Sequence, residues 1–395
     1  MRSVGATRRE LLTASAAVLG TGAAAWAGGT WQAGDRRPVG AGTRENPLRI
    51  GFLPITDAAP LLVGHAGGHF ARQDVHVAPP VLLRSWASVT ETLMAGEVDV
   101  VHLLMPMALH LRLGLGADTT VVAWNHVNGS ALTVAPHVRR LTDLAGGTVA
   151  IPAWWSIHNV VLQEMLRAEG MVPVIRRRPR ASHGEVALVP MAPADMLPAL
   201  GGGTLQGFTV ADPFNAGAAL QGVGRIHRFL GDVWRQHACC VTVVRGGLAR
   251  EHPEVLQRFT RGLVEAGRWT GAHRGEAAAM LSREFLPQPP PAIAAALHHH
   301  PHGPRPGTAP PQVDHADWYG ERLDFTPWPQ KDFTTRLVQA MRRTVVDAPD
   351  AFLRDADPAS VHARVVDDRF VRHSLEALDG PDSPLLTPRT EEYSA

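Results

Sequence analysis

The amino-acid sequence predicts an α/β protein of two lobes, and three observations lead to that prediction. Short apolar runs alternate with helical segments, a pattern typical of parallel sheets that are covered by helices on both faces. The pattern restarts near residue 148 as a second series of strand–helix units. The chain also has 395 residues, 45% of them hydrophobic and 19% charged, so it can bury more than one core. We expect the ligand site in a cleft between the lobes, where strands end.

The first series follows a Gly-, Arg- and Pro-rich linker, which we place at residues 28–47. Its expected strands are 47–53, 75–77, 98–104, 121–124 and 131–134. Its expected helices are 61–70, 86–95 and 105–113. Ser85 precedes the second of these helices and Gly96 follows it, and both residue types favour helix ends at these positions.

The second series begins after the glycine turn at residues 146–147. Its expected strands are 148–151, 186–189, 207–210 and 238–244. Its expected helices are 160–169, 192–200, 253–270, 275–284 and 337–346, with more helix after 213 and in the tail from 357. A Pro- and His-rich loop is expected at residues 287–313.

The stretch 151–159, with the sequence IPAWWSIHN, joins a predicted strand to a predicted helix. Ser156 is the expected N-cap of that helix, and His158 and Asn159 fall in its first turn. Backbone N–H groups, a hydroxyl and an imidazole would then point to one place, an arrangement that binds anions. The alternative is an ordinary strand–helix junction with a capping serine.

Residues 1–27 have the layout of an export signal. Arg8 and Arg9 precede an apolar, alanine-rich run of about 15 residues, which is short for a membrane span. Paired arginines in this position resemble the twin-arginine signal, which carries folded proteins across a membrane. We therefore expect an exported protein, periplasmic or extracytoplasmic, and no lipoprotein anchor because no cysteine follows. A disordered N-terminus with a chance Arg-Arg pair is the alternative.

Composition argues against several kinds of partner and cofactor. The net charge of +1 gives no basic field for nucleic acid. The two cysteines, Cys239 and Cys240, are adjacent, and we expect them to be buried as small apolar residues and not bridged. No zinc motif is recognisable, so the prediction is no cofactor and no metal ligands, with a co-bound metal ion left open. The histidines at 298–302 and His315 suggest either a solvated loop or adventitious metal binding.

A series of motifs in order along the chain resembles the nitrate- and bicarbonate-binding proteins of bacterial ABC importers. The resemblance covers roughly residues 48–380. The motifs are IGFLPITDAAP at 50–60, SWAS at 85–88, LMAGEVDV at 93–100, HLLMPM at 102–107, NGSALT at 128–133, IPAWWSIHN at 151–159, GFTVADPFN at 207–215, VWRQH at 233–237, HP at 252–253 and RLDF at 322–325. Each motif is weak alone, but their shared order is specific.

The resemblance implies the two-lobed periplasmic-binding-protein fold of type II, with a cleft between the lobes. Residues 48–132 and 241–395 would form the first lobe, and residues 133–240 the second. The chain would cross between lobes near Thr133 and near Ala238, which are the expected hinges. The resemblance also implies a monomeric, non-catalytic receptor that delivers a small oxyanion to a membrane permease.

The resemblance also implies which residues surround the anion: Trp86, Gly129, His158 and Arg235. An arginine fork and an imidazole would suit a small planar oxyanion. This chain departs from the family at three positions, since Ser130 stands where glutamine is usual, Arg235 where lysine is usual, and Asp212 where glutamate is common. The departures leave the ligand open among nitrate, nitrite, bicarbonate and cyanate.

Several of these residues have a structural alternative. Trp86 could pack into the lobe instead of lining the site, and Arg235 could pair with Asp232 at the surface. Asp57 could line the cleft or cap the following helix, and Asp212 could bind the ligand, serve the hinge or cap a helix. A further set of histidines is expected to be structural: His102, His110 and His126.

Three other functions remain possible. An aliphatic sulfonate or taurine receptor shares the resemblance. A cytoplasmic nitrate sensor with a regulatory partner shares the motifs but lacks an export signal. An enzyme of the thiamin-pyrimidine synthase type shares the fold, and Cys239-Cys240 is a faint parallel to the cysteine-rich run of those enzymes. Because no catalytic triad, metal cluster or phosphate loop is recognisable in the sequence, a binding protein is favoured over an enzyme.

Overall fold

The computed structural model describes residues 37–298, 314–315, 317–318 and 321–395. The predicted export signal at 1–27 and most of the His-rich loop lie outside these residues. In the described part of the chain, no helix has both the length and the apolar character needed to cross a membrane.

One mixed sheet contains the first strands of the chain, in the order β2-β1-β3-β12-β4. Its strands are β1 (Ile50–Phe52), β2 (Val81–Leu82), β3 (Val100–Leu104), β4 (Thr119–Trp124) and β12 (Cys240–Arg245). β1 runs parallel to β2 and β3, whereas β12 runs antiparallel to β3 and β4. β3 is buried along its whole length, as expected for a continuous apolar run between layers of helices.

A second mixed sheet has the order β11-β6-β10-β7-β9-β8. Its strands are β6 (Ser130–Val134), β7 (Thr148–Ile151), β8 (Val172–Val174), β9 (Glu185–Pro190), β10 (Gly207–Ala211) and β11 (Arg225–Phe229). β7 to β10 are parallel, but β6 is antiparallel to both β10 and β11. The prediction of parallel sheets is therefore wrong for the strands where the chain passes between the sheets.

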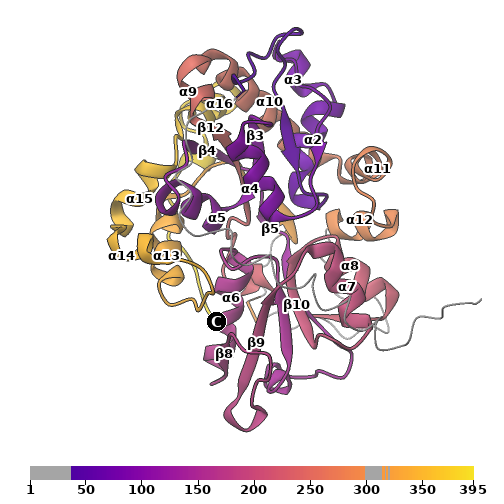
Figure 1. Cartoon of the computed structure of the whole chain (residues 1–395). Helices are drawn as coiled ribbons and strands as arrows, with labels where there is room; N and C mark the ends of the chain where they lie inside the picture. The colour runs from indigo at the N-terminus through magenta and orange to yellow at the C-terminus, as the bar shows by residue number, and fades with distance from the viewer. Residues whose placement is uncertain (1–36, 299–313, 316, 319–320) are drawn as a thin grey trace, which may run out of the picture. The chain divides into compact units, whose positions relative to one another are not determined.

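Helices cover both sheets (Figure 1). They are α2 (Ala59–Ala66), α3 (His69–Arg72), α4 (Trp86–Ala95), α5 (Met105–Leu109), α6 (Ile157–Ala168), α7 (Pro193–Gly201), α8 (Phe214–Gln221), α9 (Gly246–Glu251), α10 (Pro253–Ala272), α11 (Arg274–Glu284), α12 (Pro290–Leu297), α13 (Lys331–Met341), α14 (Ala351–Asp355), α15 (Pro358–Val365) and α16 (Arg369–Asp379). In Figure 1, α6 lies on one side of β9 and β10, and α7 and α8 lie on the other.

Three expected elements differ from the structure. Residues 290–297 form helix α12 inside the predicted loop, because alanine-rich sequence follows a proline at the first helical position and buries Ile293 and Leu297. The expected strand at 75–77 makes only one bridge, between Leu48 and Val77. The late helix expected at 337–346 begins at Lys331 and ends at Met341.

The second half of the predicted linker is packed against the fold. Val39 is 4% exposed and belongs to an apolar cluster with Leu48 and Ile50. The Arg49 guanidinium donates to the carbonyl of Pro38, which holds the backbone in place.

The crossings between sheets lie close to their predicted positions. β6 begins at Ser130, so the chain enters the second sheet ahead of the expected crossing near Thr133. The return to the first sheet is complete at Cys240, directly after the crossing expected near Ala238. A two-stranded ribbon, β5 (Val127–Asn128) with β13 (Leu323–Asp324), lies in the first of these passages.

Candidate functional site

The junction between β7 and α6 has the predicted geometry. The Ser156 hydroxyl accepts a hydrogen bond from the Asn159 backbone N–H at 3.1 Å, which makes Ser156 the N-cap of α6. His158, in the first turn, is 1% exposed. The capping prediction is confirmed, and the cap places the His158 imidazole in the interior.

His158 meets a residue of the neighbouring strand. Its Nε2 lies 2.9 Å from the hydroxyl of Ser130, the first residue of β6. Its Nδ1 is buried and has no hydrogen-bond partner among the described residues. A serine–imidazole pair at this distance resembles a nucleophile with its base, but the acidic group that orients such a base on its second nitrogen is missing from the described part of the chain.

A second group of polar side chains adjoins this pair. It consists of Asp57, His126, Cys239 and Cys240, which we call the acid–thiol cluster. All four residues are fully buried, and one potential ligand atom of each lies within 4.8 Å of the others. The Cys239 sulfur connects the cluster to the serine–imidazole pair, at 3.6 Å from Ser130 Oγ and 3.9 Å from His158 Nε2.

Asp57 Oδ2 is the centre of the acid–thiol cluster. It lies 2.8 Å from His126 Nε2, 3.3 Å from Cys239 Sγ and 3.2 Å from Cys240 Sγ. The other carboxylate oxygen, Oδ1, is buried without a hydrogen-bond partner among the described residues. One oxygen therefore has three polar neighbours and the other has none.

The two sheets jointly position Asp57. Asp57 belongs to the short 3-10 turn Thr56–Ala58 that follows β1, and Thr56 donates from both its backbone N–H and its hydroxyl to the carbonyl of Asp212. Asp212 directly follows β10 in the second sheet. The loop that carries the carboxylate is thus tied to the opposite sheet at 3.0 and 2.9 Å.

Burial and mutual attraction decide the charges in the cluster. Burial raises the pKa of Asp57 to about 6, although His126 opposes the shift. Burial alone would lower the pKa of His126, but the Asp57 carboxylate outweighs it and raises that pKa to about 10. Burial raises the pKa of Cys240, whereas Cys239 has a pKa well below its usual range because a hydrogen bond with Cys240 and the nearby His158 outweigh its burial.

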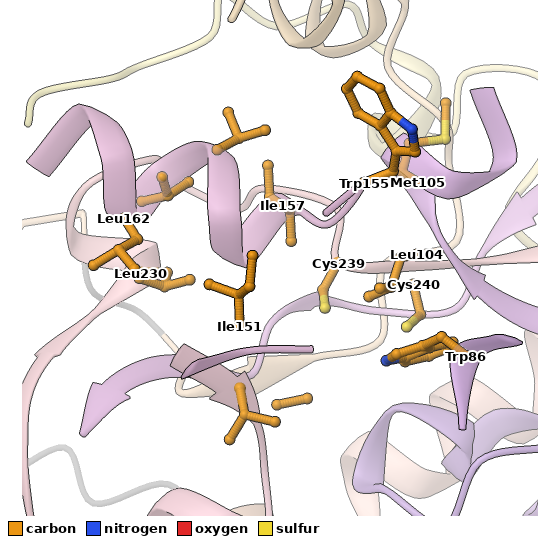
Figure 2. Close-up of a cluster of buried hydrophobic side chains, with 14 of the residues drawn as sticks. Trp86, Leu104, Met105, Ile151, Trp155, Ile157, Leu162, Leu230, Cys239 and Cys240 are labelled. Carbon is orange, nitrogen blue, oxygen red and sulfur yellow. The ribbon is translucent and has the colours of Figure 1, made fainter. Parts of the chain in front are cut away.

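Trp86 adds a buried donor next to this region. It begins α4, after the Ser85 N-cap, and is 3% exposed with an indole N–H that has no partner in the described ranges. Figure 2 shows Cys239 and Cys240 between Ile157 of α6 and the Trp86 ring. The indole packs into the core, as the structural alternative predicted, and it also borders the polar cluster, so its contact with a ligand stays a prediction.

His102 lies edge-on to Trp86, with ring centroids 5.5 Å apart. Its Nε2 accepts the Leu53 backbone N–H at 2.9 Å, and burial lowers its pKa to about 3, so the ring is neutral and carries its proton on Nδ1. That N–H has no acceptor among the described residues. His102 and Trp86 therefore present two unmatched donors in one region of the core.

Gly129 is required by the backbone of the passage into β6. Its φ of +77° is in the left-handed region, and a Cβ there would lie 2.6 Å from the Leu323 side chain and 3.2 Å from His126 Nδ1. We expect Gly129→Ala to lower the free energy of unfolding by about 1–3 kcal/mol, through strain and this contact. Urea denaturation would measure the loss. Gly116→Ala is the control for the contact, because it has φ of +65° but open space around it.

The prediction that Arg235 contacts the ligand is not supported by its position. Its side chain is 39% exposed and its guanidinium pairs with Glu392 at 2.8 Å. The alternative pairing with Asp232 is wrong, since that carboxylate pairs with Arg228 at 2.9 Å, and the ligand contact of Arg235 stays a prediction. Arg235 forms its ion pair with Glu392, a residue of the C-terminal segment, and the sequence motif around Arg235 did not predict this contact.

Asp212 has the role of a helix cap, one of the alternatives predicted for it. Its Oδ1 accepts the backbone N–H of Ala216 at 3.2 Å, in the first turn of α8. The same carboxylate forms a two-point ion pair with Arg322 at 2.7 and 2.9 Å. Its charge is therefore engaged with a protein cation, although its backbone remains next to the site.

Four residues of the site were not predicted as ligands: His102 and His126, which were expected to be structural, and Cys239 and Cys240. His237 interacts electrostatically with Cys239, His158 and His126. His237 Nδ1 lies 3.0 Å from the Trp234 carbonyl, so its buried Nε2 is an unmatched acceptor among the described residues. Burial also lowers the His237 pKa to about 4. The signal available in the sequence was the adjacent cysteine pair, which follows His237 closely. From the sequence alone, we interpreted the two cysteines as buried apolar residues.

The comparisons with known proteins agree with the resemblance to nitrate- and bicarbonate-binding proteins. The sequence pattern of the NMT1-like family matches residues 41–282. The chain is 24% identical over 242 residues to the nitrate/nitrite-binding protein NrtA of Nostoc sp., a match that covers 56% of this chain and 53% of the relative. It is also 24% identical over 288 residues to the bicarbonate-binding protein CmpA of Synechococcus sp., with 64% and 61% of the two chains covered. The chain thus spans 53% and 61% of the length of these two relatives, and 35% of the nitrate import ATP-binding protein NrtC of Synechocystis, another relative.

Among solved structures, the chain resembles the periplasmic nitrate-binding protein NrtA of Synechocystis, with a TM-score of 0.72 and 20% identity. That match covers 87% of this chain and 91% of the other. It confirms the periplasmic-binding-protein fold predicted from the sequence. The sequence match extends over well over half of the chain, and the protein therefore belongs to the NMT1-like family.

Proposed function

We propose that this protein is the extracytoplasmic solute-binding component of an ABC importer and that it captures a small, nitrate-like oxyanion between its two sheets. The support is its family, its fold and relatives that carry the names of nitrate-, nitrite- and bicarbonate-binding proteins. The proposed partners are a membrane permease and its ATPase, since one relative is a nitrate import ATP-binding protein. The proposal assigns binding and release to the protein and no catalytic step.

The observation that carries the proposal is the serine–imidazole pair where the two sheets meet. Ser130 belongs to the second sheet, and its hydroxyl contacts Cys239, which directly precedes the first-sheet strand β12. A group of atoms supplied by both sheets and closed to solvent is what a receptor needs in order to sense that its ligand is present. The unmatched Nδ1 of His158 leaves that imidazole free to bind a further group.

Unmatched donors favour an anion over a neutral solute. Trp86 Nε1–H and His102 Nδ1–H have no acceptors among the described residues, and buried donors left without acceptors are costly. An oxyanion supplies several acceptor oxygens in a small volume and forms charge-assisted hydrogen bonds with such donors. The imidazole of His158 can add a further donor when it is protonated.

The test is calorimetric titration with nitrate, nitrite, bicarbonate, cyanate and taurine. We expect at least one inorganic oxyanion to bind, and His158→Ala and Trp86→Phe each to weaken it about 10- to 100-fold, the value of one hydrogen bond to a charged group. Taurine as the only ligand would favour a sulfonate receptor. Binding weaker than millimolar for all five would refute the proposal.

Arg235→Ala is the matched control for those variants. Its guanidinium is half-exposed and pairs with Glu392, so its loss is expected to leave the affinity unchanged. If Arg235→Ala loses binding and His158→Ala retains it, Arg235 binds the ligand, as the family resemblance implied, and the site proposed around His158 is wrong.

Export separates the receptor from a cytoplasmic nitrate sensor. We propose that residues 1–27 direct a folded protein out of the cytoplasm through a twin-arginine route. Fractionation of cells that express the full chain, with Arg8→Lys/Arg9→Lys as the matched variant, should find only the unaltered protein outside the cytoplasm. A cytoplasmic location for both would favour the sensor.

A further inference from the structure

We propose that Asp57, His126, Cys239 and Cys240 form a four-ligand site for a zinc-class divalent cation. The inference goes beyond oxyanion capture and does not depend on which solute is transported. It rests on the kinds of donor, their spacing, their burial and a carboxylate oxygen, Asp57 Oδ1, that is buried without a hydrogen-bond partner among the described residues.

The donor set is one that selects zinc. Two thiolates, an imidazole and a carboxylate are the ligand types found in tetrahedral zinc sites. Calcium and magnesium prefer shells of oxygen atoms, so two sulfur donors disfavour both. Among the described residues, this is the group of three or more His, Cys, Asp and Glu side chains that come close enough together to hold a metal ion.

The spacing of the donors is close to that of a shared coordination shell. With zinc–sulfur bonds of about 2.3 Å and zinc–oxygen bonds of about 2.1 Å, tetrahedral geometry places sulfur and oxygen ligands about 3.6 Å apart. The Asp57 Oδ2 distances to Cys239 Sγ and Cys240 Sγ are 3.3 and 3.2 Å. Shifts of a few tenths of an ångström would bring these two contacts to coordination spacing. Asp57 Oδ2 and His126 Nε2, now 2.8 Å apart, would have to separate by about 0.6 Å.

His126 Nε2 faces two neighbours with opposite demands. Asp57 Oδ2, 2.8 Å away, requires a proton on that nitrogen, whereas the Cys240 backbone N–H, 3.2 Å away, requires a lone pair. A single ring nitrogen cannot satisfy both. A cation in place of the shared proton would bind a lone pair of both the nitrogen and the carboxylate oxygen, and the Cys240 N–H would then need another acceptor. The cation can also engage the buried Asp57 Oδ1, which has no partner among the described residues.

The two thiols reach the same atom although they are neighbours in sequence. Successive side chains of a regular strand point to opposite faces, so adjacent cysteines in one strand cannot share a ligand. Here β12 begins at Cys240, and Cys239 precedes it in the chain that arrives from the second sheet. The break from strand geometry turns both sulfur atoms to Asp57, which apolar packing alone would not require.

Binding balances as a displacement of protons. Zinc replaces the protons that the two cysteines and the Asp57–His126 pair hold in the metal-free site, and these protons leave to solvent with no change of oxidation state. With two thiolates and one carboxylate, the occupied site carries a net charge of −1.

The test is a titration of the full chain with Zn²⁺ and with Co²⁺ as a spectroscopic probe. Because the sequence has histidines at 298–300 and 302, the background protein carries asparagine at those four positions. We expect one equivalent of tightly bound metal and, with Co²⁺, the intense near-ultraviolet absorption of thiolate-to-cobalt charge transfer. Cys239→Ser and Cys240→Ser should each weaken zinc binding more than about 100-fold. Loss of a residue that only hydrogen-bonds to a metal ligand weakens metal affinity about 10- to 100-fold, so the larger effect identifies the cysteines as ligands.

His362→Gln is the control variant. This histidine is also buried, but it is hydrogen-bonded to Thr334 at 2.9 Å and belongs to α15, so its loss should leave metal affinity unchanged. Unaltered zinc affinity in both serine variants would overturn the proposal. If those variants do not fold, the Co²⁺ spectrum of the background protein decides, because a spectrum without thiolate bands excludes the cysteines as ligands.

Oxyanion titrations in the presence of a chelator keep the two proposals separate. Anion binding without metal binding would sustain the receptor and reject the zinc site. Metal binding without anion binding would support the zinc site and reject the oxyanion receptor.

Discussion

Asp57→Ala is expected to destabilise the protein by about 3–5 kcal/mol, the cost of leaving one partner of a buried ion pair alone. Asp57 and His126 have no exposed side-chain surface and lie 2.8 Å apart. Without the carboxylate, His126 must either remain charged in the core or lose its proton. Both thiols also lose their acceptor. Urea denaturation in the presence of a chelator, followed by tryptophan fluorescence, measures the loss without a contribution from bound metal.

Two variants make the interpretation specific. Asp350→Ala removes a carboxylate whose pairing with Arg354 is exposed, and it should cost less than about 1 kcal/mol. The double variant Asp57→Asn/His126→Gln removes both charges at similar volume and should recover part of the stability lost in Asp57→Ala. A loss below 1 kcal/mol in Asp57→Ala would show that His126 does not depend on that carboxylate.

Local signals predicted the elements that position the site. The strand at 148–151 and the helix capped by Ser156 follow from β-branched residues, a glycine turn and one capping hydroxyl, all within a dozen residues. The same holds for α4 between Ser85 and Gly96. These features depend on neighbours in sequence, and such neighbours are visible without a structure.

Strand direction could not be predicted in the same way. An apolar run buried on both faces reads the same whether its neighbour is parallel or antiparallel. β6 and β12 are antiparallel to their neighbours because each starts directly after the chain crosses from the other sheet. The direction of each strand is determined by the path of the chain between the sheets, and the pattern of hydrophobic residues does not predict that path.

The acid–thiol cluster was missed for a related reason. Its members come from the loop after β1, the turn after β4 and the start of β12, so no spacing within a motif joins them. Arg235 shows the opposite case. A motif placed it in the site, but the C-terminal segment pairs with it, since Arg235 N–H donates to the Glu392 carbonyl at 3.0 Å. The contacts that this segment makes are determined by the tertiary fold, so a local sequence motif cannot predict them.

The attachment of that C-terminal segment gives the second large effect. Trp234→Ala is expected to lower the free energy of unfolding by about 3–5 kcal/mol, the range for deleting a buried aromatic ring. The Trp234 ring is fully buried and lies 4.9 Å from the Phe333 centroid and 5.3 Å from that of Tyr393. Its indole N–H also donates to the buried carboxylate of Glu391 at 2.7 Å. Denaturation with urea measures the total loss.

Trp234→Phe separates the hydrogen bond from the packing. It retains most of the ring contacts but leaves Glu391 with Arg389 as its remaining partner, at 3.1 Å, and should cost about 1.5–3 kcal/mol. Limited proteolysis supplies the structural readout, because loss of the Trp234 contacts should expose the segment after residue 388 to cleavage before the rest of the fold opens. If Trp234→Ala keeps that segment protected and loses less than 1 kcal/mol, then backbone pairing such as the Ser394 N–H to the Val233 carbonyl, at 2.8 Å, holds it instead.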